Sequence, residues 1–203
     1  MQTIKGIAVY PRLNTPDTKF KEEGEYHTKL RIDSATADKL RLAFEPIQAD
    51  EAEKVQRDKL KGKRPKIADL PITAEEDDEG NETGEYIIRV KMKASGEKNG
   101  KAWTRTVPIF DSKGRPSNAQ IGGGSVLQVA FKPVAYYMPK DKEVGVSLYL
   151  EAVQIVELRE GGNGASASKF NFEKIEGGYE ATDEKSPTKS EDEEGDASND
   201  YNF

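Results

Sequence analysis

Lysine and arginine residues alternate with aromatic residues between positions 89 and 137. Arg89, Lys91 and Lys93 are two residues apart, so an extended strand would place all three side chains on one face. Cations in such a row bind phosphate groups. Stacking of an exposed aromatic ring on an unpaired base stabilises binding by about 1–3 kcal/mol for each base. This pattern is typical of surfaces that bind single-stranded nucleic acid. The residues expected to form such a surface are Arg89, Lys91, Lys93, Lys98, Lys101, Trp103, Arg105, Lys132, Tyr136 and Tyr137.

The same residues allow a simpler interpretation, in which the rings belong to the core and the lysines only face water. Spacing alone does not decide between the two. Tyr136 and Tyr137 limit the simpler interpretation, because adjacent residues of a strand point to opposite faces and the two rings cannot both be core.

Few residues are suited to catalysis or metal binding. The chain has no cysteine, which excludes a thiolate zinc site and a cysteine nucleophile, and His27 is its one histidine. His27 has no base or orienting partner at a useful spacing, so we interpret it as a structural or surface residue. The glycines at 122–124 lack the Gly-Lys-Ser/Thr of a phosphate-binding loop and predict a tight entry into a strand. The sequence therefore predicts a binding protein that is not an enzyme and holds no metal and no cofactor.

Acidic residues are concentrated in two short segments. Residues 75–85 contain seven of them, and residues 191–203 contain six and no lysine or arginine. The formal net charge of −6 therefore hides a basic remainder, and it does not argue against nucleic acid as a partner. We interpret 75–85 as a solvated loop, with an autoinhibitory contact to the basic face as an alternative. A metal-dependent nuclease would instead need carboxylates fixed on rigid elements.

The C-terminal part of the sequence has the composition of a disordered segment. We expect residues 1–159 to form one domain, 160–190 a flexible linker and 191–203 an acidic tail. The tail ends with an aromatic ring beside a carboxylate, which a partner protein can bind, and its acids can occupy the protein's own basic groove. A purely solubilising tail is the alternative. The residues expected to bind a partner are Glu191, Asp192, Glu193, Glu194, Asp196, Asp200 and Phe203.

The elements that must position these side chains are mostly strands. Residues 85–94 give the clearest pattern, because one face is apolar and the other is largely basic. Loops are expected at 10–17 and 94–101, and a drift in the apolar phase at Val153 predicts a bulge or bend. The expected strands are 2–10, 25–32, 85–94, 103–110, 126–137 and 144–158.

One helical insertion is expected between the second and third strands. Ser34 or Thr36 is a suitable N-cap, and Pro46 should end or kink the helix, with 49–60 as a second helical piece. Runs of strands with a single helical insertion fit a mainly β OB-fold, a five-stranded Greek-key barrel, better than a parallel α/β fold.

Several motifs occur in the order found in a known family. DSKG at 111–114, IGGGS at 121–125 and the strand at 144–158 precede an acidic tail that ends in phenylalanine. Residues 108–158 resemble the C-terminal half of the OB core in single-stranded DNA-binding proteins of short-tailed bacteriophages, and weaker collinear matches extend over nearly the whole chain. The resemblance implies a protein of phage DNA replication, recombination and repair that acts in the cytoplasm of the infected bacterial host. It also implies homodimers and recruitment of phage DNA polymerase and primase-helicase through the tail.

The resemblance assigns roles to individual positions. Tyr136 and Tyr137 would lie where family members stack bases. Lys98 or Lys101 would match a hairpin residue that contacts phosphate, and Phe203 would be the partner-binding terminus.

One position departs from the family pattern. Where the family can carry an arginine just before the second strand, this chain has Glu23 and Gly24. Arg12, Lys19 or Lys21 would have to supply the missing phosphate contact.

We therefore expect a sequence-independent single-stranded DNA-binding protein that coats its ligand by electrostatics and stacking. The alternative is an OB-like protein-interaction module, such as an assembly factor or a DNA-mimic inhibitor, that binds no oligonucleotide. No apolar run approaches the ~20 residues of a membrane span, so we expect no membrane partner.

Overall fold

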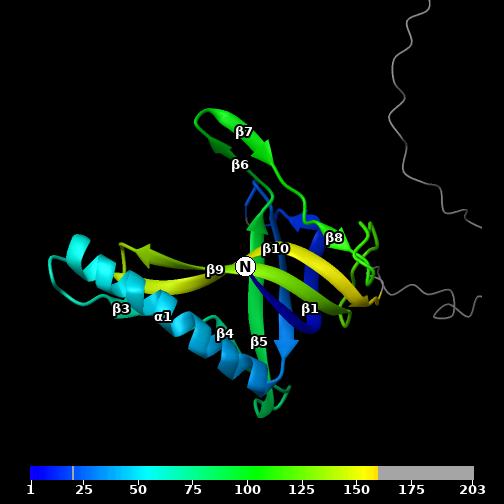
Figure 1. Cartoon of the computed structure of the whole chain (residues 1–203), viewed down its shortest axis with the longest axis horizontal. Helices are drawn as coiled ribbons and strands as arrows, with labels where there is room; N and C mark the ends of the chain where they lie inside the picture. The colour runs from blue at the N-terminus through cyan, green and yellow to red at the C-terminus, as the bar shows by residue number, and fades with distance from the viewer. Residues whose placement is uncertain (20, 160–203) are drawn as a thin grey trace, which may run out of the picture. The chain divides into compact units, whose positions relative to one another are not determined.

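Five long strands are joined edge to edge into a closed ring. The computed structural model describes residues 1–19 and 21–159. The ring has the order β1-β2-β5-β10-β9, and β9 pairs with β1 again (Figure 1). Its pairs are antiparallel except β5 with β10, which run parallel. The elements are β1 (Gln2–Asp17), β2 (Glu25–Ile32), α1 (Ser34–Asp58), β3 (Lys66–Ile67), β4 (Ile72–Glu76), β5 (Glu82–Lys93), β6 (Ser95–Lys98), β7 (Lys101–Thr104), β8 (Ile109–Phe110), β9 (Val126–Met138) and β10 (Glu143–Glu157).

This strand order, with one parallel pair among antiparallel ones, is that of an OB-fold. The helix is inserted between the second and third barrel strands. The predicted mainly β OB-fold with one helical insertion is thus confirmed. The linker at 160–190 and the acidic tail at 191–203 lie outside the described residues.

The interior of the barrel is filled by every second residue of its strands. Leu30, Val90 and Leu148 are each at most 1% exposed. A register shift between Leu150 and Ala152 marks a bulge that bends β10 around the barrel, as the drift in apolar phase predicts. Because the inward positions are fixed by this core, the residues between them must face outward.

Helix α1 packs on the barrel with one face. Leu40, Phe44 and Gln48 are buried at a spacing of four residues, and the rings of Phe44 and Phe131 of β9 meet edge to face at 6.3 Å. The Gln48 side-chain amide donates to the backbone carbonyls of Ala68 and Val144, which attaches the helix to the β3 and β10 segments. No helix in the described part of the chain is long and apolar enough to cross a membrane.

Two expectations about this helix are wrong. The N-cap is Asp33, whose carboxylate accepts from the Thr36 amide at 2.6 Å, and not Ser34 or Thr36. Of the end or kink expected at Pro46, the end does not occur, and 49–60 is no separate helical piece, because α1 continues to Asp58. Pro46 lies on the solvent side, where the carbonyl it leaves unbonded can be hydrated.

The expected loop at 10–17 is also wrong, because β1 continues to Asp17. Leu13 is 2% exposed, so the core keeps the chain extended beyond the prolines. Register shifts on either side of Arg12, with Tyr10 at a φ of 50°, accommodate Pro11 without a ladder hydrogen bond.

Three further segments differ from their predictions. Residues 75–85 form the end of β4, a turn and the start of β5, rather than a loop alone; Asp77 accepts from the amides of Glu79 and Asn81 in the turn. Residues 94–101 contribute β6 and the start of β7, so they are not a loop throughout. The strand expected at 103–110 is interrupted, and only Ile109–Phe110 pairs with β10 as β8. The Pro108 carbonyl accepts from the Val153 amide beside this short pair.

Candidate nucleic-acid interface

A row of side chains crosses four neighbouring strands on the outer face of the barrel. His27 of β2 is opposite Lys91 of β5, Lys91 is opposite Tyr149 of β10, and Tyr149 is opposite Lys132 of β9. Directly opposed residues share a face of the sheet. Tyr149 is 46% exposed and lies between two lysines in this row. We call Lys91, Tyr149 and Lys132 the platform.

Tyr149 was not among the residues predicted for the interface. The signal was nevertheless present in the sequence. The apolar residues Val144, Val146, Leu148 and Leu150 define the inward face of this strand, which leaves Tyr149 on the opposite face. His27 was interpreted as a structural or surface residue, and the structure places it at the end of the platform row.

Tyr136 and Tyr137 point to opposite faces of β9, as predicted. Tyr136 is opposite Gly145, and a β-carbon added to Gly145 would lie 2.4 Å from the Tyr136 ring, so the ring covers this glycine. Tyr137 is opposite the fully buried Val144 and shares the inward side. Tyr136 therefore extends the face of Lys132 along β9, whereas Tyr137 lies on the other side.

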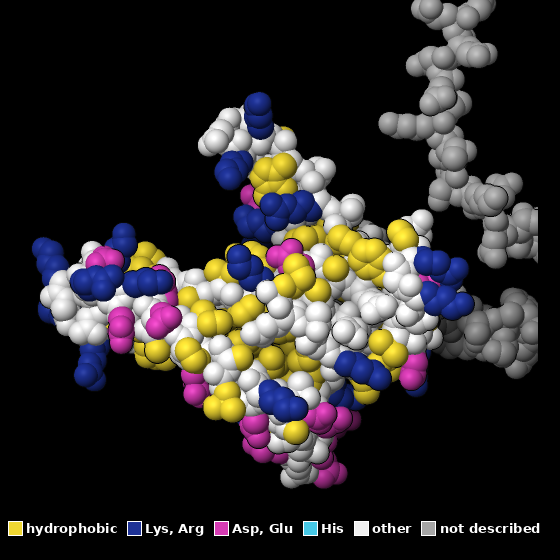
Figure 2. All heavy atoms as spheres, in the orientation of Figure 1, with side chains coloured by type: hydrophobic (Ala, Val, Ile, Leu, Met, Phe, Trp, Pro, Cys, Tyr) yellow, Lys and Arg dark blue, Asp and Glu magenta, His cyan; other side chains and the backbone are white. Residues whose placement is uncertain are grey.

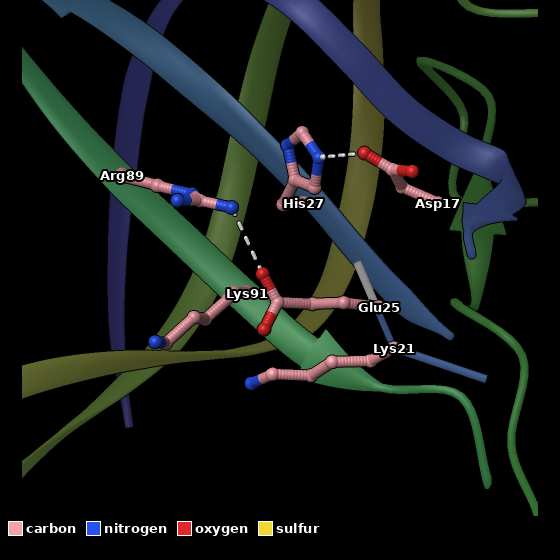
Figure 3. Close-up of a pocket in the computed structure, with 6 residues that line it drawn as sticks. All are labelled: Asp17, Lys21, Glu25, His27, Arg89 and Lys91. Carbon is pink, nitrogen blue, oxygen red and sulfur yellow. Dashed lines mark hydrogen bonds and ion pairs between the residues drawn. The ribbon is translucent and has the colours of Figure 1, made fainter. Parts of the chain in front are cut away.

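Two predicted cations are already paired within the protein. Arg89 Nη2 lies 2.9 Å from Glu25 Oε1, and Lys93 Nζ lies 2.9 Å from Glu23 Oε2. In Figure 3 a dashed line joins the Glu25 carboxylate to Arg89 and not to Lys91. Within residues 1–19 and 21–159, Lys91 itself takes part in no side-chain ion pair.

A pocket of about 230 Å³ opens beside these pairs, and it is lined by both signs of charge. His27 Nε2 lies 3.5 Å from Asp17 Oδ2 (Figure 3). The backbone amide of Lys19 and then the His27 side chain lower the pKa of Asp17, so this carboxylate stays ionised. No group of three acidic or histidine side chains in the described part of the chain could hold a metal ion. The lining residues are Asp17, Lys21, Glu25, His27, Arg89 and Lys91.

The other predicted residues lie on a two-stranded hairpin, β6 and β7, beyond the end of β5. Its exposed cations surround an aromatic ring, as the blue and yellow side chains of the projecting arm show (Figure 2). The Trp103 ring lies over Gly96 of the opposite strand, and the Arg105 guanidinium stacks 4.5 Å from its centroid. We call residues 95–105 the basic hairpin. It brings together Lys98, Lys101, Trp103 and Arg105.

The base of the basic hairpin is tied to the turn before β2. Ser95 Oγ donates to the Glu23 carbonyl at 2.8 Å, and the Ala94 amide donates to the Gly24 carbonyl at 2.9 Å. Lys21 of the same turn lines the pocket. The predicted tail residues 191–203 lie outside the described residues.

The site and the fold together define a class. A closed OB barrel that carries cations around exposed aromatic rings has the architecture of OB-fold nucleic-acid-binding proteins. The fold is similar to that of gp2.5, a single-stranded DNA-binding protein encoded by bacteriophage T7, with a TM-score of 0.62 and 24% identity over 81% of this chain and 96% of that one. It is also similar to the single-stranded DNA-binding protein of bacteriophage Enc34, with a TM-score of 0.51 and 15% identity over 83% of this chain and 89% of the other.

The likeness to these phage proteins lies in the fold. No protein-family profile matches the chain, and no curated protein matches it in sequence. At this level the resemblance predicted from the motifs is confirmed.

Proposed function

We propose that this chain binds single-stranded DNA without reading base edges. The observation that carries the proposal is the platform, in which an exposed ring stands between two lysines on a closed barrel. Lysine ammonium groups follow the phosphates, and Tyr149 stacks on an unpaired base. In a duplex the bases are stacked on their neighbours, so their faces are not accessible to Tyr149. This arrangement therefore favours single strands. The names of the structural relatives point to the same ligand.

We propose that the protein acts in phage DNA replication, recombination and repair, in the cytoplasm of the infected bacterial host. It serves as a binding protein and not as an enzyme. Its tail recruits the phage DNA polymerase and primase-helicase, and the protein forms homodimers. The support for these roles is the ordered set of motifs and the acidic composition of residues 191–203.

A second candidate function is a protein-interaction module that binds no oligonucleotide. The observation that favours it is the acidic end of the β4–β5 hairpin, where magenta side chains gather on the surface (Figure 2). This surface lies at the end of β5 opposite the basic hairpin (Figure 1). A DNA-mimic inhibitor would use such an acidic surface to bind a DNA-binding partner.

Fluorescence anisotropy with a labelled oligo-dT and a matched hairpin duplex distinguishes these functions. We expect tight, salt-sensitive binding to oligo-dT and little binding to the duplex. A Lys91→Gln/Lys132→Gln variant should bind oligo-dT with a salt slope smaller by about 1.4, because about 0.7 is lost with each cation. Lys54→Gln, on the exposed side of α1, is the matched control and should keep the wild-type slope. Absence of binding to either oligonucleotide would overturn the proposal in favour of the interaction module.

A further inference from the structure

Of the four predicted cations Arg89, Lys91, Lys93 and Lys132 on this side of β5 and β9, two carry their own counter-ions. Lys93 is bound to Glu23 and Arg89 to Glu25, each with an N···O distance of 2.9 Å. Within the described residues, neither Lys91 nor Lys132 of the platform has such a pair. One face therefore contains two kinds of cation, those that are neutralised and those that are available.

The two carboxylates are held in place by backbone structure. Glu25 belongs to β2, its side chain is 17% exposed, and it lies opposite Lys93 in the register with β5. Glu23 lies in the turn that Ser95 and Ala94 tie to the base of the basic hairpin. The contact with Lys93 lowers the pKa of Glu23 and raises the pKa of Lys93, so both remain charged near neutral pH.

We infer that Glu23 and Glu25 are specificity-determining residues. They act as built-in counter-ions that compete with phosphate for Lys93 and Arg89. This inference rests on the proposed function. A phosphate that reaches Lys93 must displace a carboxylate already bound there, so the exchange adds little to the binding free energy. A polyanion without bases gains only at the available cations, whereas a single strand also gains the stacking on Tyr149. The carboxylates therefore favour ligands with exposed bases over bare phosphate chains and duplexes.

The paired cations should not contribute to the salt dependence of DNA binding. Each phosphate contact normally releases counterions from the nucleic acid, and log K falls with log salt by about 0.7 per contact for single strands. A cation that stays bound to its own carboxylate makes no such contact and adds nothing to the slope. Removal of one carboxylate should therefore raise the slope by about 0.7.

The experiment compares Glu23→Gln and Glu25→Gln with Glu79→Gln, all in the full-length chain. Glu79 lies in the turn between β4 and β5, so this control makes the same charge change away from the site. The probes are labelled oligo-dT, a hairpin duplex and inorganic polyphosphate, which has the backbone charge and no bases. We expect each of the two site variants to bind polyphosphate and duplex about two- to fivefold more tightly than wild type at low salt. The oligo-dT salt slope should rise by about 0.7, and Glu79→Gln should change neither quantity.

A double variant tests that the effect passes through the ion pair. In a Lys93→Gln background, Glu23→Gln should no longer raise the salt slope, because the released cation is absent. Equal slopes for wild type and both site variants would overturn the inference, as would an equal gain in Glu79→Gln. Thermal unfolding confirms that each variant is folded, and Glu23, half exposed, is the safer of the two positions. If the wild type did not bind oligo-dT at all, the proposed function itself would be overturned.

Discussion

The platform and the basic hairpin both combine cations with an aromatic ring, but different structures support them. The platform residues occupy three strands of a closed barrel, and the residues beside them, such as Val90, Leu148 and Phe131, are fully buried. The basic hairpin is a separate sheet of two strands with four residues each, and such a sheet has little stability of its own. The barrel thus fixes the proposed stacking position at Tyr149, whereas the hairpin presents its cations on a sheet with less stability of its own.

The largest expected effect is a loss of barrel stability, which distinguishes the barrel from the hairpin. Phe44 is fully buried between α1 and β9, so Phe44→Ala should lower the free energy of unfolding by about 3–5 kcal/mol. Denaturant unfolding measures this loss. Leu42→Ala, at an exposed position of the same helix, is the control and should change stability little.

Hydrogen exchange in the same variant makes the comparison sharper. Amides of β9 and β10 should lose protection with the global stability, since they open with the barrel. Amides of β6 and β7 should exchange quickly in wild type and change little in the variant. If the hairpin amides were as protected as those of β9, the two regions would form one cooperative unit and the comparison would fail.

The next effect concerns the stacking position. Tyr149→Ala should weaken oligo-dT binding by about 1–3 kcal/mol, or roughly 5- to 150-fold, because one base loses its ring. The salt slope should stay at the wild-type value, since no cation is removed. Tyr149→Phe keeps the ring and should bind as wild type does. Anisotropy titrations at several salt concentrations measure both quantities, and an unchanged affinity in Tyr149→Ala would mean that the platform does not stack bases.

Local patterns in the sequence predict the barrel face better than the hairpin. The alternation in 85–94 correctly separates the inward Ile88 and Val90 from the outward Arg89 and Lys91. The alternation of Val144, Val146, Leu148 and Leu150 likewise leaves Tyr149 on the outer face, although Tyr149 was not predicted for the interface. Both patterns have one physical cause, because burial of one side of a strand fixes the direction of every side chain along it.

Contacts between distant segments were beyond the reach of such patterns. Glu23 and Lys93 are 70 residues apart in the sequence, and their pairing follows from the register between β2 and β5. The continuation of α1 through Pro46 depends on which side of the helix faces solvent. The extension of β1 beyond Tyr10 depends on a core position for Leu13. In each case tertiary packing overrides a local signal.

The smallest expected effect tests the hairpin through its tryptophan, which is the only one in the sequence. A β-carbon added to Gly96 would lie 2.5 Å from Trp103 Cζ2, so Gly96→Ala must displace the ring and its stacked Arg105. We expect a red shift of the Trp103 emission and a change in the free energy of unfolding within about 0.5 kcal/mol, because the barrel core is untouched.

Gly123→Ala is the matched control for this substitution. Gly123 is exposed, and an added β-carbon there meets no atom within 4 Å, so its emission and stability should equal those of wild type. For Gly96→Ala, oligo-dT affinity should fall only about twofold, since the hairpin cations remain and the platform is intact. A loss as large as that of Tyr149→Ala would reverse the comparison, because the hairpin and not the barrel would then hold the strand.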